Sequence, residues 1–363
     1  MLQQLLRRLF NKKREVHKVD MHPVRGFWQS LIDEKLAKGE TLTVLAPMAD
    51  VTDIAFRTLI AKYSKPHGPD VMWTEFVSAN GLCSHGREIL KRDLEFGEQE
   101  RPIVAQLFTA EPEKMREAAK LCRELGFDGI DINMGCPDRS IEKQKSGAFH
   151  IRDWKQAQEV IRAAQEGAGD IPVSVKTRLG YNKMEFMEWL PKLLECNIPV
   201  LTVHLRTRKE MSLVPAHWEI MPEIVALVRA MTGEVQNGGT IILGNGDIKS
   251  VTEGKQKAKE TGCDGVMVGR GIFGTPWFFD ETIFNKGKSV PERLRICVEH
   301  TKLFEEKLGD IKSFAIMKKH YKAYVHGFDG AKELRMKLME CENSKEIEEE
   351  INAFLRAHSS GTL

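Results

Sequence analysis

A cysteine in a turn that contains glycine and proline is the residue of this chain best suited to chemistry. Cys136 lies in the pentapeptide NMGCP at 133–137, directly after the apolar run at 129–132. Glycine allows backbone dihedrals that other residues resist, and proline fixes its own φ, so such a turn can hold one side chain in a defined place. The thiol can then act as a nucleophile or a proton donor. These five residues alone support equally well a buried, inert cysteine at a strand end.

Two glycine-rich segments further along the chain have the composition of a phosphate-binding site. They read GNGD at 244–247 and GRG at 269–271, and each follows a short β-rich run. Glycines let backbone N–H groups approach an anion, and an arginine adds a charge-assisted contact. We therefore expect Gly246, Gly269 and Arg270 to bind a phosphorylated cofactor or substrate. The alternative is that the glycines only close tight turns.

Other polar side chains also lie at or near the ends of β-rich runs. Lys176 can stabilise negative charge that develops on a ring oxygen or nitrogen, although a lysine in such a place is more often solvated or salt-bridged. His204 on its own indicates a hydrogen-bonded structural histidine. Its grouping with Lys176, Gln106 and Asn133 favours a set of side chains that face a ligand.

The elements that position these residues alternate along the chain. Eight β-rich runs, each followed by a helix-compatible segment, predict a (β/α)₈ barrel of about 240 residues, with its active site at the C-terminal ends of the strands. A doubly wound sheet is the main alternative, but the count of eight and the lack of an early G-x-G-x-x-G turn favour the barrel. We expect strands at 43–48, 71–76, 103–108, 129–133, 173–178, 200–205, 240–244 and 265–268, and helices at 111–125, 153–166, 183–196, 218–231 and 251–261.

Three regions are expected. Residues 1–40 form a basic helical extension, whose first eighteen residues can build an amphipathic helix that touches a membrane surface or RNA, or that is simply mobile. Residues 41–284 form the barrel. The polar connector NKGKSVP at 285–291 then leads to a strandless helical domain at 291–358.

Composition narrows the class of protein. Hydrophobic residues make up 42% and charged residues 29% of the 363 residues, which is typical of a soluble protein with a substantial core. No apolar run approaches the ~20 residues that span a bilayer, so we expect no integral membrane association. The seven cysteines are scattered and form no C-x-x-C pair, which argues against disulfides and a closed zinc site, predicts no metal, and favours a reducing cytoplasm.

Seven short segments of the chain, taken together and in order, resemble the tRNA-dihydrouridine synthases, flavin enzymes that reduce uridine in RNA. The resemblance covers most of residues 42–340, and KKHYKAY at 318–324 is similar to the family's C-terminal helical domain. The seven segments are APMADVTDIAFR at 46–57, VAQLF at 104–108, DINMGCP at 131–137, VSVKTRLG at 173–180, VHLRTR at 203–208, GNGDI at 244–248 and DGVMVGRG at 264–271.

The resemblance implies FMN in the barrel, NADPH as reductant, and reduction of uridine to 5,6-dihydrouridine in RNA, most often tRNA. Hydride would pass from reduced flavin to C6 of uracil, and Cys136 would protonate C5 as a general acid. A thiol with an unperturbed pKa of ≈ 8.5 suits this role because it stays protonated near neutral pH.

The resemblance also assigns the remaining site residues. The flavin ring would be contacted by Pro47, Met48, Ala49, Gln106, Lys176 and His204. The ribityl phosphate would be held by Asn245, Gly246, Asp247, Gly269 and Arg270. The substrate would be bound by Asn133, Arg139, Arg178, Arg206 and Arg208.

Three positions depart from the family pattern. Arg139 stands where the family often has lysine, and Leu205 and Val214 replace glycines. We place these departures on the substrate side of the barrel mouth, so the target nucleotide and the substrate RNA stay open.

The helical domain carries the charge expected of an RNA partner. Aromatic Phe314, Tyr321 and Tyr324 are interleaved with its basic residues, and a basic face with accessible aromatics can follow phosphates and stack on bases. The alternative is a solvated surface with the aromatics in its core. We expect RNA as the partner and favour a monomer. The basic residues are Lys302, Lys307, Lys312, Lys318, Lys319, Lys322, Lys332, Arg335 and Lys337.

Two other functions remain as alternatives. One is an FMN barrel that acts on a free pyrimidine, similar to dihydroorotate dehydrogenase, although a small substrate needs no basic platform. The other is a non-catalytic RNA-binding protein on a retained barrel, which the intact set of Cys136, Lys176 and His204 disfavours.

Overall fold

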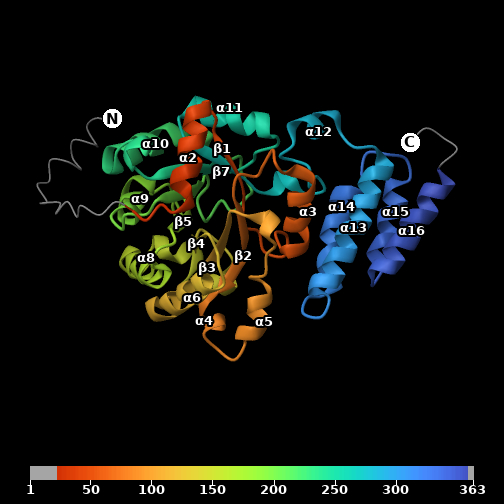
Figure 1. Cartoon of the computed structure of the whole chain (residues 1–363), viewed down its shortest axis with the longest axis horizontal. Coiled ribbons are helices and arrows are strands. Elements are labelled where there is room, and N and C mark those ends of the chain that lie inside the picture. The colour runs from red at the N-terminus through yellow and green to blue at the C-terminus, as the bar shows by residue number, and fades with distance from the viewer. Residues whose placement is uncertain (1–22, 359–363) are drawn as a thin grey trace, which may run out of the picture.

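Eight parallel strands form the centre of the molecule (Figure 1). The computed structural model describes residues 23–358, and the amphipathic segment expected within residues 1–18 lies outside them. The strands are β1 Leu42–Leu45, β2 Met72–Ser78, β3 Ile103–Phe108, β4 Gly129–Met134, β5 Val173–Arg178, β6 Val200–His204, β7 Ile241–Asn245 and β8 Gly265–Val268.

The sheet closes on itself. Neighbouring strands pair in parallel in the order β1-β8-β7-β6-β5-β4-β3-β2. Backbone hydrogen bonds from Leu45 N to Val71 O, at 3.0 Å, and from Asp70 N to Thr43 O, at 2.8 Å, join β1 to the residues before β2. The predicted (β/α)₈ barrel is therefore confirmed. The largest shift is in β1, which ends at Leu45 because Pro47 has no N–H to continue a ladder.

Helices cover the outside of the barrel, and all five predicted ones are present. Their ends are set by local chemistry: Asp53, Asp153 and Ser250 each accept a hydrogen bond from a backbone N–H three residues on. Gly126 and Gly262 follow helices with φ of 83° and 75°. The helices are α3 Ile54–Ser64, α4 Ala79–Leu82, α5 Arg87–Arg92, α6 Pro112–Glu124, α7 Arg139–Lys143, α8 Trp154–Ala168, α9 Phe186–Leu194, α10 Met221–Thr232, α11 Val251–Thr261 and α12 Glu281–Lys286.

Helix α2, Phe27–Lys38, covers the N-terminal ends of the strands. Trp28 and Ile32 are 1% and 2% exposed and pack against inward-facing residues of the strands, with the rings of Trp28 and Trp73 6.0 Å apart. Arg25 Nη2 donates to Val235 O at 3.0 Å and ties the segment down. This part of the expected N-terminal extension therefore closes one end of the barrel.

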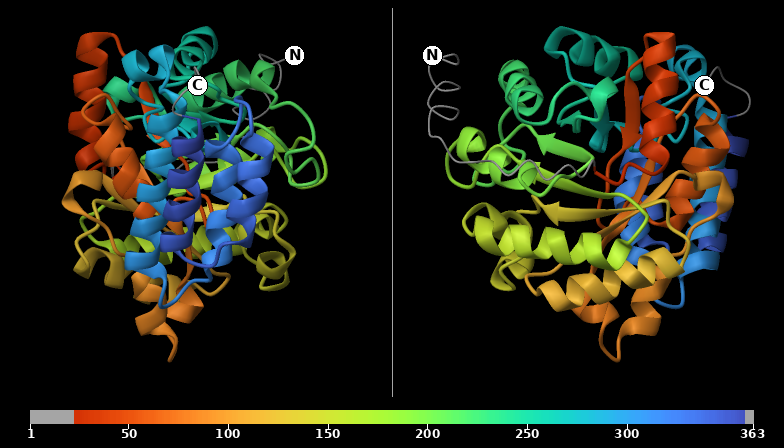
Figure 2. Two further views of the ribbon diagram at one scale, coloured as in Figure 1. Left: turned by 90° about the vertical axis from the view of Figure 1, so that its right-hand side faces the viewer. Right: turned by 60° about the vertical axis from the view of Figure 1, so that its left-hand side comes forward.

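The helical C-terminal region predicted from the sequence is present, and its helices gather on one side of the barrel beside α3 (Figures 1 and 2). They are α13 Val290–Leu308, α14 Lys318–Tyr324, α15 Ala331–Glu340 and α16 Ser344–Ala357. Tyr321 and Tyr324 are 0% exposed and belong to the core of this region. Of the two alternatives that the sequence leaves open, Tyr321 and Tyr324 therefore follow the second: they lie in a core and are not accessible for base stacking.

Charge and aromatic contacts dock this region on the barrel. Lys312 pairs with Glu75 at 2.6 Å and with Asp93 at 2.9 Å. The ring of His300 stacks on Phe56 of α3 with centroids 4.9 Å apart. Burial lowers the pKa of His300 well below its ordinary value, so this contact is made by a neutral ring. Within residues 23–358, no helix combines the length and apolarity needed to cross a membrane.

Removing the Lys312 cation should weaken the whole fold. In Lys312→Met the carboxylates of Glu75 and Asp93 lose their shared partner in a largely buried place, and breaking a buried ion pair costs about 3 kcal/mol. We expect the free energy of unfolding in urea to fall by that amount. The control is Lys332→Met, which changes an exposed lysine with no ion pair among residues 23–358. Equal stability of the two variants would contradict this role.

Candidate active site

A cavity of about 590 Å³ opens at the C-terminal ends of the strands, a size that suits a cofactor-sized ligand. The parallel register brings its polar residues together: Asn133 lies beside Lys176, and His204 lies between Arg178 and Asn245. The lining comprises Ala46, Pro47, Met48, Phe76, Gln106, Asn133, Gly135, Cys136, Pro137, Lys176, Arg178, His204, Arg206, Ser212, Asn245, Gly246, Asp247, Ile248, Lys249, Gly269, Arg270 and Gly271.

All but three of the site residues expected from the sequence line this cavity. Ala49 and Arg139 are exposed and outside the lining, and Arg208 lies in a neighbouring ion pair. Sequence reasoning missed Phe76 of β2 and Lys249 after β7. The available signal for Phe76 was its place at the end of a predicted strand.

The Cys136 thiol faces the cavity and not the barrel core. Asn133 Oδ1 accepts hydrogen bonds from Gly135 N at 3.1 Å and from Cys136 N at 2.9 Å. On the other side, Ala148 N donates to Cys136 O at 2.9 Å. Gly147 has φ of 63°, and a Cβ there would lie 2.8 Å from Cys136 O, so glycine is required at this close approach. The loop therefore holds the sulfur in one place.

Burial raises the pKa of the Cys136 thiol, and the nearby charges of Arg178 and Lys176 oppose this only in part. The group is accordingly a neutral thiol near pH 7. A neutral thiol can donate a proton, whereas a nucleophilic cysteine needs a depressed pKa.

Positive charge dominates the cavity. Burial, with a contribution from Arg178, lowers the pKa of Lys176 to about 8, and burial lowers the pKa of Arg178 to about 10. Both shifts come mainly from burial and to a smaller extent from neighbouring cations, so an anionic ligand in the cavity would favour the charged forms. The cationic side chains of the lining are Lys176, Arg178, Arg206, Lys249 and Arg270, and its single carboxylate is Asp247.

His204 is a neutral imidazole. Burial and the surrounding cations lower its pKa well below the ordinary value. Arg206 Nη1 lies 3.0 Å from His204 Nε2 and can only donate. The imidazole proton is therefore on Nδ1, and His204 can donate one hydrogen bond from that atom.

The loops after β7 and β8 provide backbone donors. The N–H groups of Gly246, Asp247 and Arg270 donate no hydrogen bond within residues 23–358. The Asp247 carboxylate accepts from Arg206 Nη2 and, at 3.2 Å, from Arg270 Nη2. Because two guanidinium groups neutralise Asp247, unpaired backbone donors and the exposed side of Arg270 remain for an anion such as a phosphate.

Arg178 and Arg208 both tie loops together. Arg178 Nε donates to Gly135 O at 2.6 Å, and its Nη1 donates to Thr207 O at 3.1 Å. Arg208 Nε binds both oxygens of Glu142 in α7, at 2.8 and 3.0 Å. Arg178 and Arg208 thus join the segment that carries Cys136 to the loop after β6. The family resemblance assigns both arginines to the substrate.

Leu205 lies away from the substrate side. It is 0% exposed and packs in the main hydrophobic core, outside the cavity lining. Placing this departure at the mouth is therefore wrong: the strand alternation turns residue 205 outward, toward the helices, when His204 faces the cavity.

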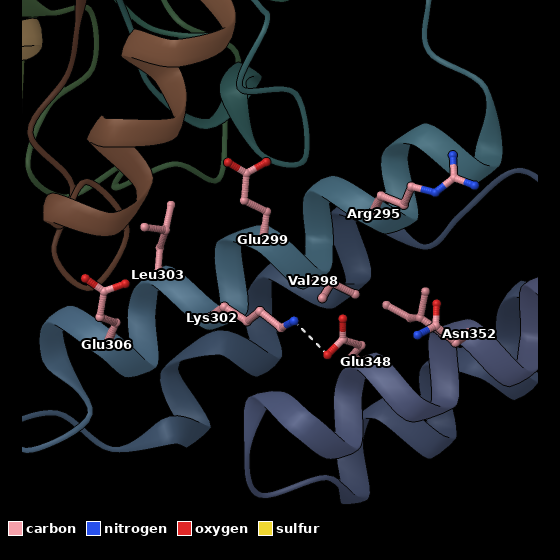
Figure 3. A pocket seen from close by; sticks show the side chains of 9 residues that line it. Arg295, Val298, Glu299, Lys302, Leu303, Glu306, Glu348 and Asn352 are labelled. Atoms are coloured by element: carbon pink, nitrogen blue, oxygen red, sulfur yellow. Dashed lines mark ion pairs between the residues drawn. The ribbon is translucent and has the colours of Figure 1, made fainter.

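A second hollow of about 390 Å³ lies between α13 and α16 (Figure 3). Its carboxylates, Glu299, Glu306 and Glu348, outnumber its cations, Arg295 and Lys302. Lys302 is also paired with Glu348 at 2.6 Å, as the dashed line shows (Figure 3). This surface does not suit a phosphate backbone and holds no nucleophile, so the barrel cavity is the candidate active site.

The barrel cavity fits a flavin nucleotide. Pro47, Met48 and Phe76 give it apolar walls, and Lys176 supplies a cation beside them. The unpaired N–H groups after β7 and β8 suit the phosphate. Among residues 23–358 no cluster of three or more histidine, cysteine, aspartate or glutamate side chains could hold a metal ion.

A (β/α)₈ barrel whose rim carries unpaired backbone N–H groups, several cations and a neutral thiol has the parts that a flavin-dependent reductase would use, and comparisons with known proteins identify the family. Residues 44–359 match the family described as "Dihydrouridine synthase (Dus)". "Probable tRNA-dihydrouridine synthase 2" of Bacillus subtilis (strain 168) is 39% identical over 88% of this chain and 95% of its own length. "Probable tRNA-dihydrouridine synthase" of Staphylococcus epidermidis (strain ATCC 35984) is 38% identical over 86% of this chain and 93% of its own length.

The chain belongs to the dihydrouridine synthase family, as the seven segments predict. The match runs through the barrel and the helical region alike. Among solved structures, "Structure of morphinone reductase in complex with tetrahydroNAD" aligns with a TM-score of 0.47 and 12% identity over 68% of this chain and 87% of that chain, a likeness too distant to bear on function.

Anion binding in the cavity should weaken at alkaline pH. Lys176, with a pKa of about 8, loses its charge between pH 7 and pH 9. We expect the apoprotein to bind FMN about tenfold more weakly at pH 9, the effect of one lost charged contact, in a flavin-fluorescence titration. Lys176→Met should bind weakly at both pH values, whereas Lys249→Met, at an exposed lysine of the rim, should keep the pH dependence. Wild-type affinity that does not change with pH would contradict the assignment.

Proposed function

We propose that this protein reduces uridine in tRNA to 5,6-dihydrouridine, with FMN as its cofactor and NADPH as its reductant. The observation that carries the proposal is the Cys136 thiol, kept neutral by burial and fixed at the rim of a cation-rich cavity in a chain of the dihydrouridine synthase family. The seven cysteines are all unpaired, which fits work in a reducing cytoplasm.

The proposed cofactor contacts follow the cavity. Pro47 and Met48 would lie along the flavin ring, and Gln106 and Lys176 would meet its polar edge. Its phosphate would be held by Arg270 and the N–H groups after β7 and β8. Bound FMN supplies the hydride that C6 of uracil receives.

Cys136 would then donate its proton to C5 of the same ring. The C–H bond forms as the S–H bond breaks, and the thiolate left behind lies near Arg178 and Lys176, whose charges stabilise it. Solvent can return the proton before the next turnover. Arg206 and the Nδ1–H of His204 are two further donors of the lining that would be available to uracil oxygens.

The RNA would reach this site across α14. Lys319 lies 3.8 Å from Asp50, which follows β1 at the cavity mouth, and Lys322 is exposed further along the same helix. Because Tyr321 and Tyr324 are buried, charge and not stacking must hold the backbone here. The uridine would be turned out of its stack to reach the thiol.

Replacing the proton donor separates chemistry from cofactor binding. Cys136→Ala should retain bound FMN and lose at least about a hundredfold in dihydrouridine formation, the usual scale for a general acid. The readout is dihydrouridine in tRNA by mass spectrometry, with NADPH and then NADH as reductant. Cys83→Ala, at a cysteine outside the cavity lining, is the matched control. Full activity of Cys136→Ala, or a purified protein that takes up no FMN, would falsify the proposal.

A further inference from the structure

A buried carboxylate lies beneath the proposed reaction site. Asp131 of β4 is 0% exposed and points into the barrel between Gln106 of β3 and Ser174 of β5, its neighbours in register. Gln106 Nε2 donates to Asp131 Oδ2, and Ser174 Oγ donates to Asp131 Oδ1, both at 2.6 Å. The mechanism above gives this group no role.

Two side-chain amides connect Asp131 to the thiol loop. Gln106 Oε1 accepts from Asn133 Nδ2 at 3.3 Å. Asn133 Oδ1 in turn accepts the N–H groups of Gly135 and Cys136, at 3.1 and 2.9 Å. An unbroken series of hydrogen bonds therefore runs from the carboxylate to the backbone of Cys136.

Which groups donate and which accept along this series of hydrogen bonds follows from the chemistry of Asp131. An ionised carboxylate only accepts hydrogen bonds, so Gln106 must turn its NH₂ toward Asp131 and its oxygen toward Asn133. Asn133 must then present its NH₂ to Gln106 and its oxygen to the loop. The reverse arrangement would direct the Asn133 NH₂ at two backbone N–H donors, leaving buried donors unsatisfied.

We propose that Asp131 is a positioning residue, which sets the orientation of Gln106 and Asn133 and through them holds the Cys136 loop in its proton-donating place. This inference rests on the proposed function. Asp131 also places a negative charge near Lys176, and this charge raises the pKa of that lysine.

The ionisation of Asp131 should affect how kcat depends on pH. Burial raises the pKa of Asp131 to about 6, opposed by Gln106, Ser174, Lys176 and the nearby Trp73. Lys176 is the charged group among these four. Protonation below pH 6 lets Asp131 donate, and the forced orientation of Gln106 is lost.

The test uses the FMN-loaded enzyme with tRNA as substrate. Asp131→Asn can accept or donate toward Gln106, so we expect kcat to fall about tenfold while FMN content and the KM for tRNA stay within about threefold. Ser174→Ala is the matched control: it removes the other donor to Asp131, leaves the orientation of Gln106 forced, and should change kcat by less than about threefold.

A charge swap provides the decisive comparison. In Asn133→Asp alone, Gln106 faces a carboxylate on each side and must turn its oxygen to one of them, so activity should fall. In the double variant Asp131→Asn with Asn133→Asp, the series can run in the opposite direction: the new carboxylate accepts from both Gln106 and the loop. We expect kcat of the double variant to exceed that of either single variant at least threefold.

The outcomes separate the two proposals. Wild-type enzyme that forms no dihydrouridine overturns the proposed function. Active wild type with an unchanged Asp131→Asn, a fall in Ser174→Ala equal to that in Asp131→Asn, or no recovery in the double variant overturns the role of Asp131 alone. If Asp131→Asn does not fold, the wild-type profile decides: kcat must fall below about pH 6, and a flat profile down to pH 5 overturns the inference.

Discussion

The parallel direction of all eight strands is the constraint on which the site depends. It brings the last residues of every strand to one rim, so side chains far apart in the sequence share a cavity. Most of the charged ones are cations, and burial, with a smaller contribution from their mutual repulsion, lowers the pKa of Lys176 and Arg178. Under the proposed function this destabilisation falls where an anion would bind, so fold stability and ligand binding make opposite demands on the same residues.

The cavity rim also carries two titratable side chains that are held in their neutral forms. Cys136 and His204 are kept uncharged by burial, the thiol by a raised pKa and the imidazole by a lowered pKa. The same physics operates where the helical region meets the barrel, where burial lowers the pKa of His320 to about 3. Desolvation therefore fixes protonation states both for chemistry and for docking.

The sequence was sufficient for the fold and for most of the cavity. Alternation of β-rich and helical runs identified the strands, and the glycine-rich segments around 246 and 269 identified two loops that line the cavity, because these are local signals. Contacts between residues of distant loops could not be predicted from the sequence. The family resemblance assigns Arg208 to the substrate, but Arg208 pairs with Glu142, 66 residues away. The sequence also left open whether Tyr321 is accessible or lies in a core, as the structure has it. Asp131 belongs to the segment DINMGCP, but its proposed role depends on hydrogen bonds with Gln106 and Ser174, which lie on other strands.

Helix α2, which closes the base of the barrel, affects how substrates can reach the cavity. Trp28 and Ile32 fill that end of the barrel, and the cavity opens at the opposite end, at the rim. Under the proposed function, an electron donor and a tRNA that both enter by this opening would have to occupy it in turn. Reduction of the cofactor and reduction of the RNA would then be separate half-reactions, and the rate of turnover would depend on how quickly the first partner dissociates.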